Sequence, residues 1–290
     1  MINVNLTNEL REFAKKAFKD DAVELLIGFE PLSNGSNGRP VVIFSENEIE
    51  KLTWNDSLTF NLSVLLRKFK NKKVGIIANG CIGRSIVVLI NEGQIKRENV
   101  VIIGIPCQGM RDYQGGEMYE NCQSCKYPTP PVYDYLISSN KALEANDDTL
   151  GMRVKKIESL TDSEKLSYFN EQMSKCIRCY ACRQACPMCY CETCFVDINS
   201  PKWLSKEASN ADNTIWNITR IYHLAGRCVE CGACARACPE GVDLMYLIGK
   251  MNRDVKEMFG FEAGLKIGVK SALETFNPND PDFFWKGECC

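Results

Sequence analysis

The sequence predicts an α/β domain with parallel strands over 1–150, followed by an all-α domain over 151–265 and a C-terminal tail over 266–290. Two observations predict the first domain: short apolar segments rich in β-branched residues, and a segment of helical length between them. A third observation predicts the second domain, because beyond Thr161 helical periodicity dominates and no strand signal of similar quality returns. A chain of 290 residues is long enough for about two such domains.

In the first domain, the segments "KVGIIA" (73–78) and "VVIIGI" (100–105) flank the helical stretch "RSIVVLINEGQI". A strand, a helix and a second strand in this order form a βαβ unit, so we expect the two strands to be parallel. The capping-box pattern Ser45-x-x-Glu48 predicts the start of a helix. The proline-rich stretch "YPTPPVYDY" (127–135) predicts an extended connection that closes this domain.

In the second domain, the capping-box pattern Thr161-x-x-Glu164 predicts another helix start. A later helix is expected from about residue 213 to the glycine at 226. Its spaced apolar side chains are Ile215, Ile218 and Tyr222. Apolar residues at helical spacing usually face the core, so we expect this stripe to be buried.

Composition excludes several classes of protein. The net charge is −2 and charges of both signs are interspersed, which argues against a nucleic-acid partner. No apolar run approaches the roughly 20 residues of a membrane helix, and the N-terminus lacks the pattern of a secretory signal. We therefore expect a cytoplasmic protein without membrane insertion, in which seventeen cysteines indicate metal or redox chemistry rather than disulfides.

Two cysteine motifs with the same spacing, C-x2-C-x2-C-x3-C-P, interrupt the helices of the second domain. In this spacing three thiolates hold one 4Fe-4S cluster, and the fourth, which precedes proline, ligates the cluster of the other motif. The predicted ligand sets are Cys176, Cys179, Cys182 and Cys238 for one cluster, and Cys228, Cys231, Cys234 and Cys186 for the other. Two structural zinc sites are the alternative, although zinc usually pairs C-x2-C with a second pair well downstream.

Four further cysteines gather around the predicted parallel strands. Cys81 follows the first strand and Cys107 follows the second, so one crossover should bring both to the same edge of the sheet. Cys122 and Cys125 add a C-x2-C from a loop that can fold back over this edge. We expect a third 4Fe-4S cluster here, with zinc or unligated buried thiols as the alternatives.

The region from about Thr161 to Gly260 resembles the helical two-cluster ferredoxin domain of heterodisulfide reductase small subunits and related respiratory iron-sulfur proteins, through the eight motif cysteines. The stretch "WNITRIYHLAGRCVECGACARACPEGVDL" is also similar to that family in the helix that leads into the second motif. The resemblance implies a ferredoxin-like domain in which helices replace the sheet of a bacterial ferredoxin.

Residues 20–135 resemble the N-terminal domain of the β subunits of deazaflavin-linked hydrogenases and formate dehydrogenases, through Cys81, Cys107, Cys122 and Cys125. Those subunits bind a flavin and a deazaflavin through regions that this sequence does not match. The stretch "NGCIGR" also lacks the G-x-G-x-x-G spacing of a dinucleotide site. The resemblance therefore implies a cluster, and it leaves flavin binding open.

Three cysteines of the stretch "CPMCYCETC" lie outside these ligand sets: Cys189, Cys191 and Cys194. Their dense C-x-C-x2-C spacing suggests an additional metal site, and buried thiols are the alternative. Cys289 or Cys290 could supply the missing fourth ligand only if the tail folds back.

The remaining polar residues offer no catalytic site. The single histidine, His223, is expected to be a structural residue, and no nucleophile motif or carboxylate pair is present. Arg84, Arg178 and Arg183 lie near cluster cysteines, and we expect them to be solvated or salt-bridged rather than to set cluster potentials.

The sequence therefore predicts a non-catalytic electron-transfer subunit. About three 4Fe-4S clusters would carry single electrons between redox subunits of a cytoplasmic anaerobic oxidoreductase complex. By resemblance, the partners are a formate dehydrogenase or hydrogenase catalytic subunit and a heterodisulfide-reductase-type flavoprotein, with the tail as a docking segment. The alternative is a stand-alone flavin and iron-sulfur oxidoreductase that reduces a deazaflavin or a disulfide.

Overall fold

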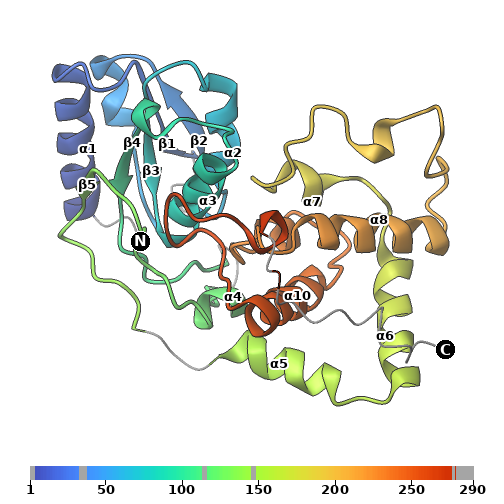
Figure 1. Cartoon of the computed structure of the whole chain (residues 1–290). Helices are drawn as coiled ribbons and strands as arrows, with labels where there is room; N and C mark the ends of the chain where they lie inside the picture. Colours follow the sequence, from blue (N-terminus) through green and yellow to red (C-terminus); the bar gives the residue numbers. More distant parts are fainter. Residues whose placement is uncertain (1–3, 33–37, 113–115, 145–147, 276–277, 279–290) are drawn as a thin grey trace.

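The N-terminal half of the protein is built around one sheet, with α1 on one face and α3 on the other (Figure 1). This computed structural model describes residues 4–32, 38–112, 116–144, 148–275 and 278. The strand order is β2-β1-β3-β4-β5, in which β2 runs antiparallel to β1 and the other neighbours are parallel. The strands are β1 (Leu25–Pro31), β2 (Gly38–Ile43), β3 (Val74–Ala78), β4 (Val100–Gly104) and β5 (Tyr135–Leu136).

The C-terminal half is helical, so the predicted change from α/β to helical structure is confirmed. Among the described residues no helix combines the length and the apolar character that crossing a bilayer requires. The helices of the whole described chain are α1 (Val4–Lys19), α2 (Ser63–Leu66), α3 (Gly80–Asn91), α4 (Glu120–Gln123), α5 (Thr149–Glu158), α6 (Asp162–Lys175), α7 (Ala181–Gln184), α8 (Asn210–His223), α9 (Ala233–Arg236) and α10 (Leu244–Phe259).

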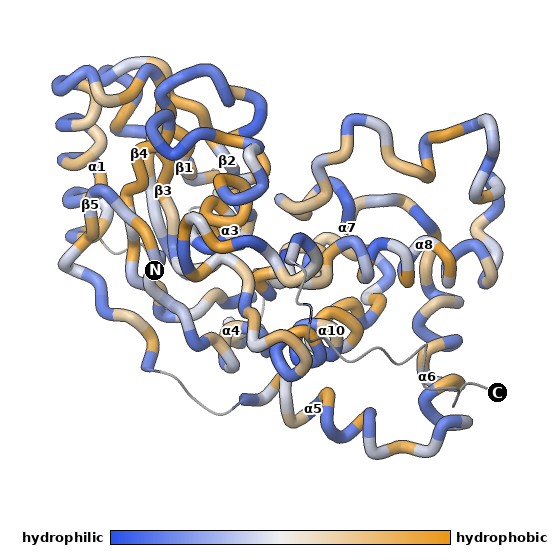
Figure 2. Tube along the Cα trace, viewed as in Figure 1, coloured by the Kyte–Doolittle hydropathy of each residue, from blue (hydrophilic) through white to orange (hydrophobic). Residues whose placement is uncertain are grey.

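The predicted βαβ unit is present as β3, α3 and β4. Val74 lies opposite Val100 and Ala78 opposite Gly104 in a parallel register. Both faces of these strands are covered, which explains why their sequences are continuously apolar rather than alternating. Figure 2 shows the same concentration of apolar residues in β3, β4 and α3.

The two capping-box predictions had different outcomes. At Thr161 the box is confirmed, because the Thr161 hydroxyl accepts from the Glu164 N–H and the Glu164 carboxylate accepts from the Thr161 N–H. At Ser45 a helix does start, as the 3-10 helix Glu46–Lys51, but the box itself is absent because the Ser45 side chain makes no capping hydrogen bond. Glu48 instead accepts a hydrogen bond from the N–H of Phe44, at 3.1 Å.

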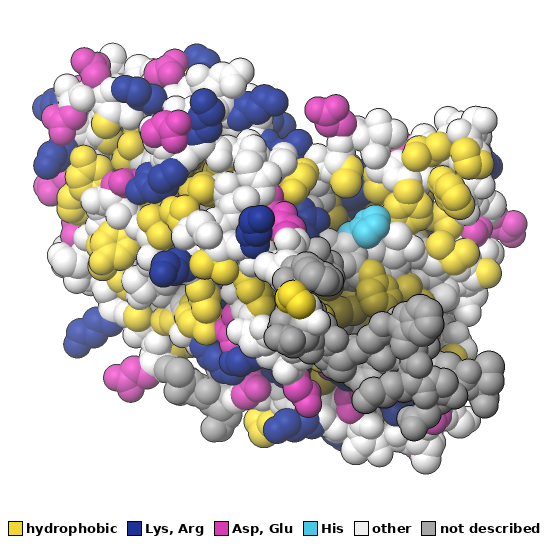
Figure 3. Space-filling view, viewed as in Figure 1, with side chains coloured by type: hydrophobic (Ala, Val, Ile, Leu, Met, Phe, Trp, Pro, Cys, Tyr) yellow, Lys and Arg dark blue, Asp and Glu magenta, His cyan; other side chains and the backbone are white. Residues whose placement is uncertain are grey.

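The orientation of α8 is the reverse of the prediction. The side chains of Ile215, Ile218 and Tyr222 are 47 %, 39 % and 62 % exposed. The buried face carries Trp216 and also the polar residues Asn213, Asn217 and Arg220. Hydrophobic side chains are accordingly visible at the surface over α7 and α8, near the single histidine (Figure 3).

One hydrophobic cluster joins the two halves. The core of the sheet, which includes Ile77 and Ile103, continues into Met188, Leu224 and Val229 of the C-terminal half. A separate small cluster packs α5 against α10. The halves are therefore fixed against each other, and the thiols at the sheet edge face the second cysteine motif.

Candidate metal centre

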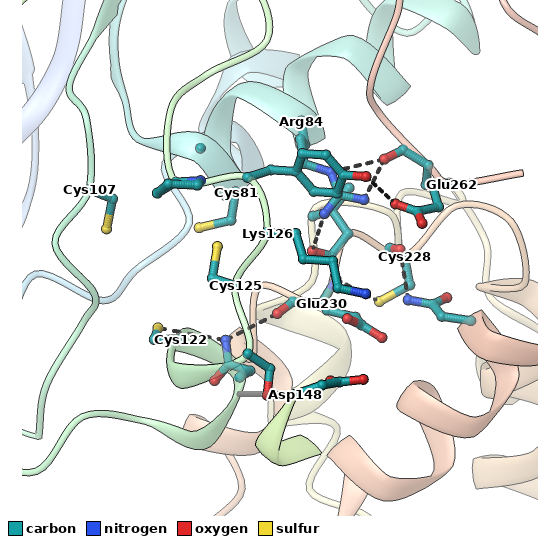
Figure 4. Close-up of a pocket in the computed structure, with 18 of the residues that line it drawn as sticks. Cys81, Arg84, Cys107, Cys122, Cys125, Lys126, Asp148, Cys228, Glu230 and Glu262 are labelled. Atoms are coloured by element: carbon teal, nitrogen blue, oxygen red, sulfur yellow. Dashed lines mark hydrogen bonds between the residues drawn. The ribbon is translucent and has the colours of Figure 1, made fainter. Parts of the chain in front are cut away.

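The four cysteines of the first domain come from three places in the fold. Cys81 lies in the first turn of α3, directly after β3, and Cys107 follows β4. Cys122 lies in α4, and Cys125 follows that helix. Figure 4 shows the sulfur atoms of these four side chains facing a common space. All four also line a cavity of about 180 Å³ between the two halves of the protein.

The backbone after the C-x2-C pair holds this arrangement together. The carbonyl oxygen of Pro128 accepts hydrogen bonds from the N–H of Gly80, at 3.1 Å, and from the N–H of Cys107, at 3.0 Å. A Cβ atom at residue 80 would lie only 1.8 Å from the carbonyl oxygen of Tyr127. Glycine is required there because the chain at 127–128 crosses the start of α3 so closely.

Polar groups contact the sulfur atoms of this quartet. Asn79 caps α3 by accepting from the N–H of Ile82, and its Oδ1 also accepts from the Cys81 thiol at 3.1 Å. The N–H of Gly109 donates to the Cys107 sulfur at 3.4 Å. Hydrogen bonds to sulfur stabilise thiolates and tune the potential of a cluster that they ligate.

The two motifs of the second domain repeat one backbone conformation. Arg178 and Tyr180 have φ angles of 49° and 60°, and Glu230 and Gly232, at the equivalent positions, have 56° and 70°. These left-handed residues are strained except at Gly232, and such strain commonly marks functional sites. Each motif then enters a one-turn helix, α7 or α9, and the two helices pack against each other.

The structure brings the motif cysteines together across the two motifs. One small pocket is lined by Cys176, Cys179, Cys182 and Cys238. Burial raises the pKa of the Cys228 thiol well above its usual range, and the neighbouring thiols Cys231, Cys186 and Cys234 raise it further. These two groups have the composition of the predicted crossed ligand sets, although the assignment of ligands stays a prediction.

The three thiol groups follow one another through the molecule. Burial raises the pKa of Cys81 well above its usual range, and Cys231 of the second motif is the first of the neighbouring thiols that add to this effect. The amide of Asn121, beside Cys122, donates to the carbonyl oxygen of Glu230, at 3.1 Å. At the other end Cys234 is a neighbour of Cys182.

The donor set fits clusters of iron and sulfide. In the part of the chain that the structure describes, no three His, Cys, Asp or Glu side chains lie close enough to hold a single metal ion. Sulfur ligands round one zinc ion would lie only about 3.8 Å apart, given Zn–S bonds of about 2.3 Å, whereas a cubane holds its ligands farther from one another. Burial raises the pKa of Cys107 to about 12 and that of Cys182 to about 11, so iron would have to displace their protons.

Cys189, Cys191 and Cys194 do not converge. Cys189 lies beside Cys186, which donates a hydrogen bond to it and lowers its pKa. Cys191 is exposed, and Cys194 contacts the guanidinium of Arg183. Cys289 and Cys290 lie outside the described residues, so the additional metal site stays a prediction without support from the described geometry.

The arginines near the cysteines differ from the expectation in one of three cases. Arg183 forms the predicted ion pair, with Asp197 at 2.8 Å. Arg84 instead donates to the carbonyl oxygen of Ala263, at 2.7 Å, and stacks on Tyr127. Arg178 is buried, forms an ion pair with Asp212 at 3.7 Å, and also donates to the carbonyl oxygens of Ser205 and Glu207.

A fourth arginine was missed by sequence reasoning. Arg220 is 2 % exposed and lies on the buried face of α8, among the thiols of both motifs. Its position, four residues after Trp216 and three after Asn217, is a signal that could have been used. An arginine on the same helical face as a tryptophan is either buried with it or covers it.

Comparison with protein families gives a match to the region of the two cysteine motifs. Residues 172–242 match the family model of a 4Fe-4S dicluster domain, and this region contains both motifs. The match supports at least two 4Fe-4S clusters, and with them the iron-sulfur, electron-transport and oxidoreductase character predicted from the motifs. The likeness to heterodisulfide reductase subunits stays a prediction.

Two curated relatives are β subunits of formate dehydrogenases. The chain is 29% identical over 100 residues to the F420-dependent formate dehydrogenase subunit beta of Methanocaldococcus jannaschii, which covers 34% of this chain and 26% of the relative. It is 29% identical over 105 residues to the F420-dependent formate dehydrogenase 1 subunit beta of Methanococcus maripaludis, which covers 36% and 26%. The chain thus matches about a quarter of the length of these relatives, and it is an iron-sulfur protein similar in part to formate dehydrogenase β subunits.

Proposed function

We propose that the chain is an electron-transfer subunit that carries single electrons through three 4Fe-4S clusters in series. The observation that carries this proposal is the succession of thiol groups. The first-domain quartet lines the same cavity as Cys228, and Cys234 lies in a hydrophobic cluster against which Cys182 also packs, so the predicted clusters form one path. Clusters change oxidation state by one electron without exchange of ligands, which suits such a path.

The two ends of this path differ in exposure. At one end Cys179 is exposed, and the side chain of the adjacent Ile177 is 54 % exposed. At the other end the first-domain thiols line the cavity between the halves. We infer that a partner docks near Cys179 to exchange electrons with the cluster of the first motif.

The identity of the partner subunits is also part of this proposal. The similarity to formate dehydrogenase β subunits supports a complex of the formate dehydrogenase type, with a formate dehydrogenase or hydrogenase catalytic subunit on one side. A heterodisulfide-reductase-type flavoprotein would accept or supply electrons on the other. The described part of the tail ends near Thr275, so docking by the remainder rests on its sequence alone.

A stand-alone flavin enzyme is the second candidate, favoured by the cavity beside the first-domain thiols. Its lining carries charges of both signs, from Lys126, Arg253, Asp148 and Glu230. A small substrate or part of a flavin could contact these groups. The measurements below separate the two candidates.

The decisive experiment is anaerobic reconstitution of the single chain with iron and sulfide, followed by metal analysis and low-temperature EPR during a reductive titration. Three cubanes require about twelve irons per chain and as much sulfide. Zinc without sulfide would refute the cluster assignment. A bound flavin, or turnover of a deazaflavin or disulfide without partners, would favour the enzyme over the electron-transfer subunit.

A further inference from the structure

Arg220 is a buried cation without a carboxylate partner. It is 2 % exposed, and no ion pair within 4.0 Å joins it to any described Asp or Glu side chain. The one hydrogen bond with good geometry runs from Nη2 to the carbonyl oxygen of Cys182, at 3.2 Å. Burying an uncompensated charge costs several kcal/mol, on the order of the penalty for a desolvated ion. Something other than a carboxylate must therefore stabilise it.

The neighbours of this guanidinium are thiols. The guanidinium lies among Cys234, Cys186, Cys189 and Cys182, and its Nη2 donates to the carbonyl oxygen of Cys182. Cys182 belongs to the predicted ligand set of one cluster, and Cys186 and Cys234 belong to the other. The guanidinium thus lies between the two predicted clusters of the second domain.

Two donor atoms of Arg220 remain unused in the described structure. Nε and Nη1 are buried and have no hydrogen-bond partner of acceptable geometry. The thiols of Cys189 and Cys234 lie within hydrogen-bonding reach of the guanidinium. Buried donors without partners are rare, so these two are available for sulfur atoms of ligands or clusters.

Three other arginines beside the motifs are already compensated. Arg183 pairs with Asp197, and Arg227 forms two hydrogen bonds with the carboxylate of Glu92. Arg178 lies near Asp212 and bonds two carbonyl oxygens. Arg236 also has no ion pair among the described residues, but it donates to the carbonyl oxygens of Thr59 and Cys231 and lies on the side of Cys122. Arg220 differs from it because it lies among thiols of both motifs of the second domain.

We propose that Arg220 is a positioning residue that raises the reduction potentials of both clusters of the second domain. This inference rests on the proposed clusters. Each reduction adds one electron, and hence one negative charge, to a cluster. A fixed positive charge between two clusters stabilises the reduced form of each, and hydrogen bonds from Nε and Nη1 to sulfur add to this effect.

The test is an EPR-monitored redox titration of reconstituted Arg220→Gln. At a given ambient potential, the ratio of reduced to oxidised cluster should fall at least tenfold for both clusters, which is about 59 mV for a one-electron couple. Arg220→Lys keeps the charge and should recover at least half of this shift. The first-domain cluster should not move, and Arg97→Gln, which removes a charge paired with Asp134, should leave all potentials unchanged.

A second measurement does not require the uncharged variant Arg220→Gln. The wild-type protein is labelled with guanidino-15N arginine, and electron–nuclear double resonance is recorded on the reduced clusters. We expect a hyperfine coupling between the cluster spin and a 15N nucleus, and this coupling should disappear in Arg220→Lys. Unchanged potentials in fully loaded Arg220→Gln, equal shifts in the Gln and Lys variants, or the absence of that coupling in wild type would each overturn the role of Arg220. A wild-type protein that binds zinc without sulfide would refute the clusters themselves, before Arg220 is tested.

Discussion

The two kinds of thiol site depend on different levels of structure. Each motif of the second domain supplies its cysteines within one short segment, 176–186 or 228–238, through a repeated left-handed backbone. The first-domain quartet instead spans 81–125, and the parallel register of β3 and β4 brings its first two members together. A local motif tolerates changes elsewhere in the fold, whereas the quartet requires the whole sheet edge. Single substitutions should therefore affect the first-domain quartet and the second-domain motifs differently.

The largest expected effect is the loss of one whole cluster. Cys125→Ser should remove about four of twelve irons and leave the EPR signals of the second-domain clusters intact, because its thiolate belongs to the quartet. Cys186→Ser should also remove about four irons, and these should come from the cluster held by the second motif, although Cys186 belongs to the first. Iron and sulfide analysis with EPR measures both.

Cys191→Ser is the matched control for these variants, because its thiol is exposed and belongs to none of the three predicted ligand sets. It should keep all its iron. If Cys186→Ser instead abolished the signal of the cluster held by Cys176, Cys179 and Cys182, the crossing of ligands between the motifs would be wrong.

A smaller effect should follow from Gly80→Ala. The new methyl group would lie 1.8 Å from the Tyr127 carbonyl oxygen, so the chain at 127–128 must move away from the sheet edge. Overpacking of this kind costs about 1–3 kcal/mol, and we expect the variant to lose first-domain iron selectively. Gly241→Ala, with a φ of 59° and no atom within 4 Å of its Cβ, should cost about 1–2 kcal/mol and keep all iron. Equal iron content in the two variants would contradict the role of Gly80.

The same contrast explains how far the sequence alone could lead. The cysteine spacing, the βαβ unit and the Thr161 capping box are local patterns, and each has its counterpart in the structure. The short strand β5 and the antiparallel β2 carry no comparable local signal, because their pairing is decided by the neighbouring strands.

The helical spacing of apolar residues gave a wrong prediction on α8, where the buried face of the helix is polar. On α8 the spacing of Ile215, Ile218 and Tyr222 predicts a core face, but the motifs beside α8 present carbonyl oxygens and thiols rather than apolar side chains. Such an interior is matched by amide and guanidinium donors. Arg220 was missed for this reason, since helical periodicity gives the spacing of a buried face and not its chemistry.

A further test asks whether the buried polar face of α8 stabilises the first cysteine motif. The Asn213 amide donates to the carbonyl oxygens of Met173, at 3.0 Å, and Cys176, at 2.6 Å. Asn213→Ala removes the side-chain donor from the Cys176 carbonyl oxygen, whereas the Met173 carbonyl oxygen keeps its bond from the Cys176 N–H, and the substitution should cost about 1–3 kcal/mol. Anaerobic denaturation of the loaded protein measures this loss, and iron release to a chelator should be faster from the second domain than from the quartet. If Asn213→Ala released iron from both sites at the wild-type rate, Asn213 would not stabilise the first motif.

The smallest effect is expected on the opposite face of the same helix. Ile218→Ser replaces a side chain that is 39 % exposed and should change the free energy of unfolding by no more than about 0.5 kcal/mol, with full iron content. Denaturation of Ile218→Ser beside Asn213→Ala therefore compares the two faces directly. A loss above about 1 kcal/mol in Ile218→Ser would show that this face is covered in the protein in solution. An unchanged stability combined with weaker association with a redox partner would instead identify the apolar face of α8 as part of the docking surface beside the exposed Cys179.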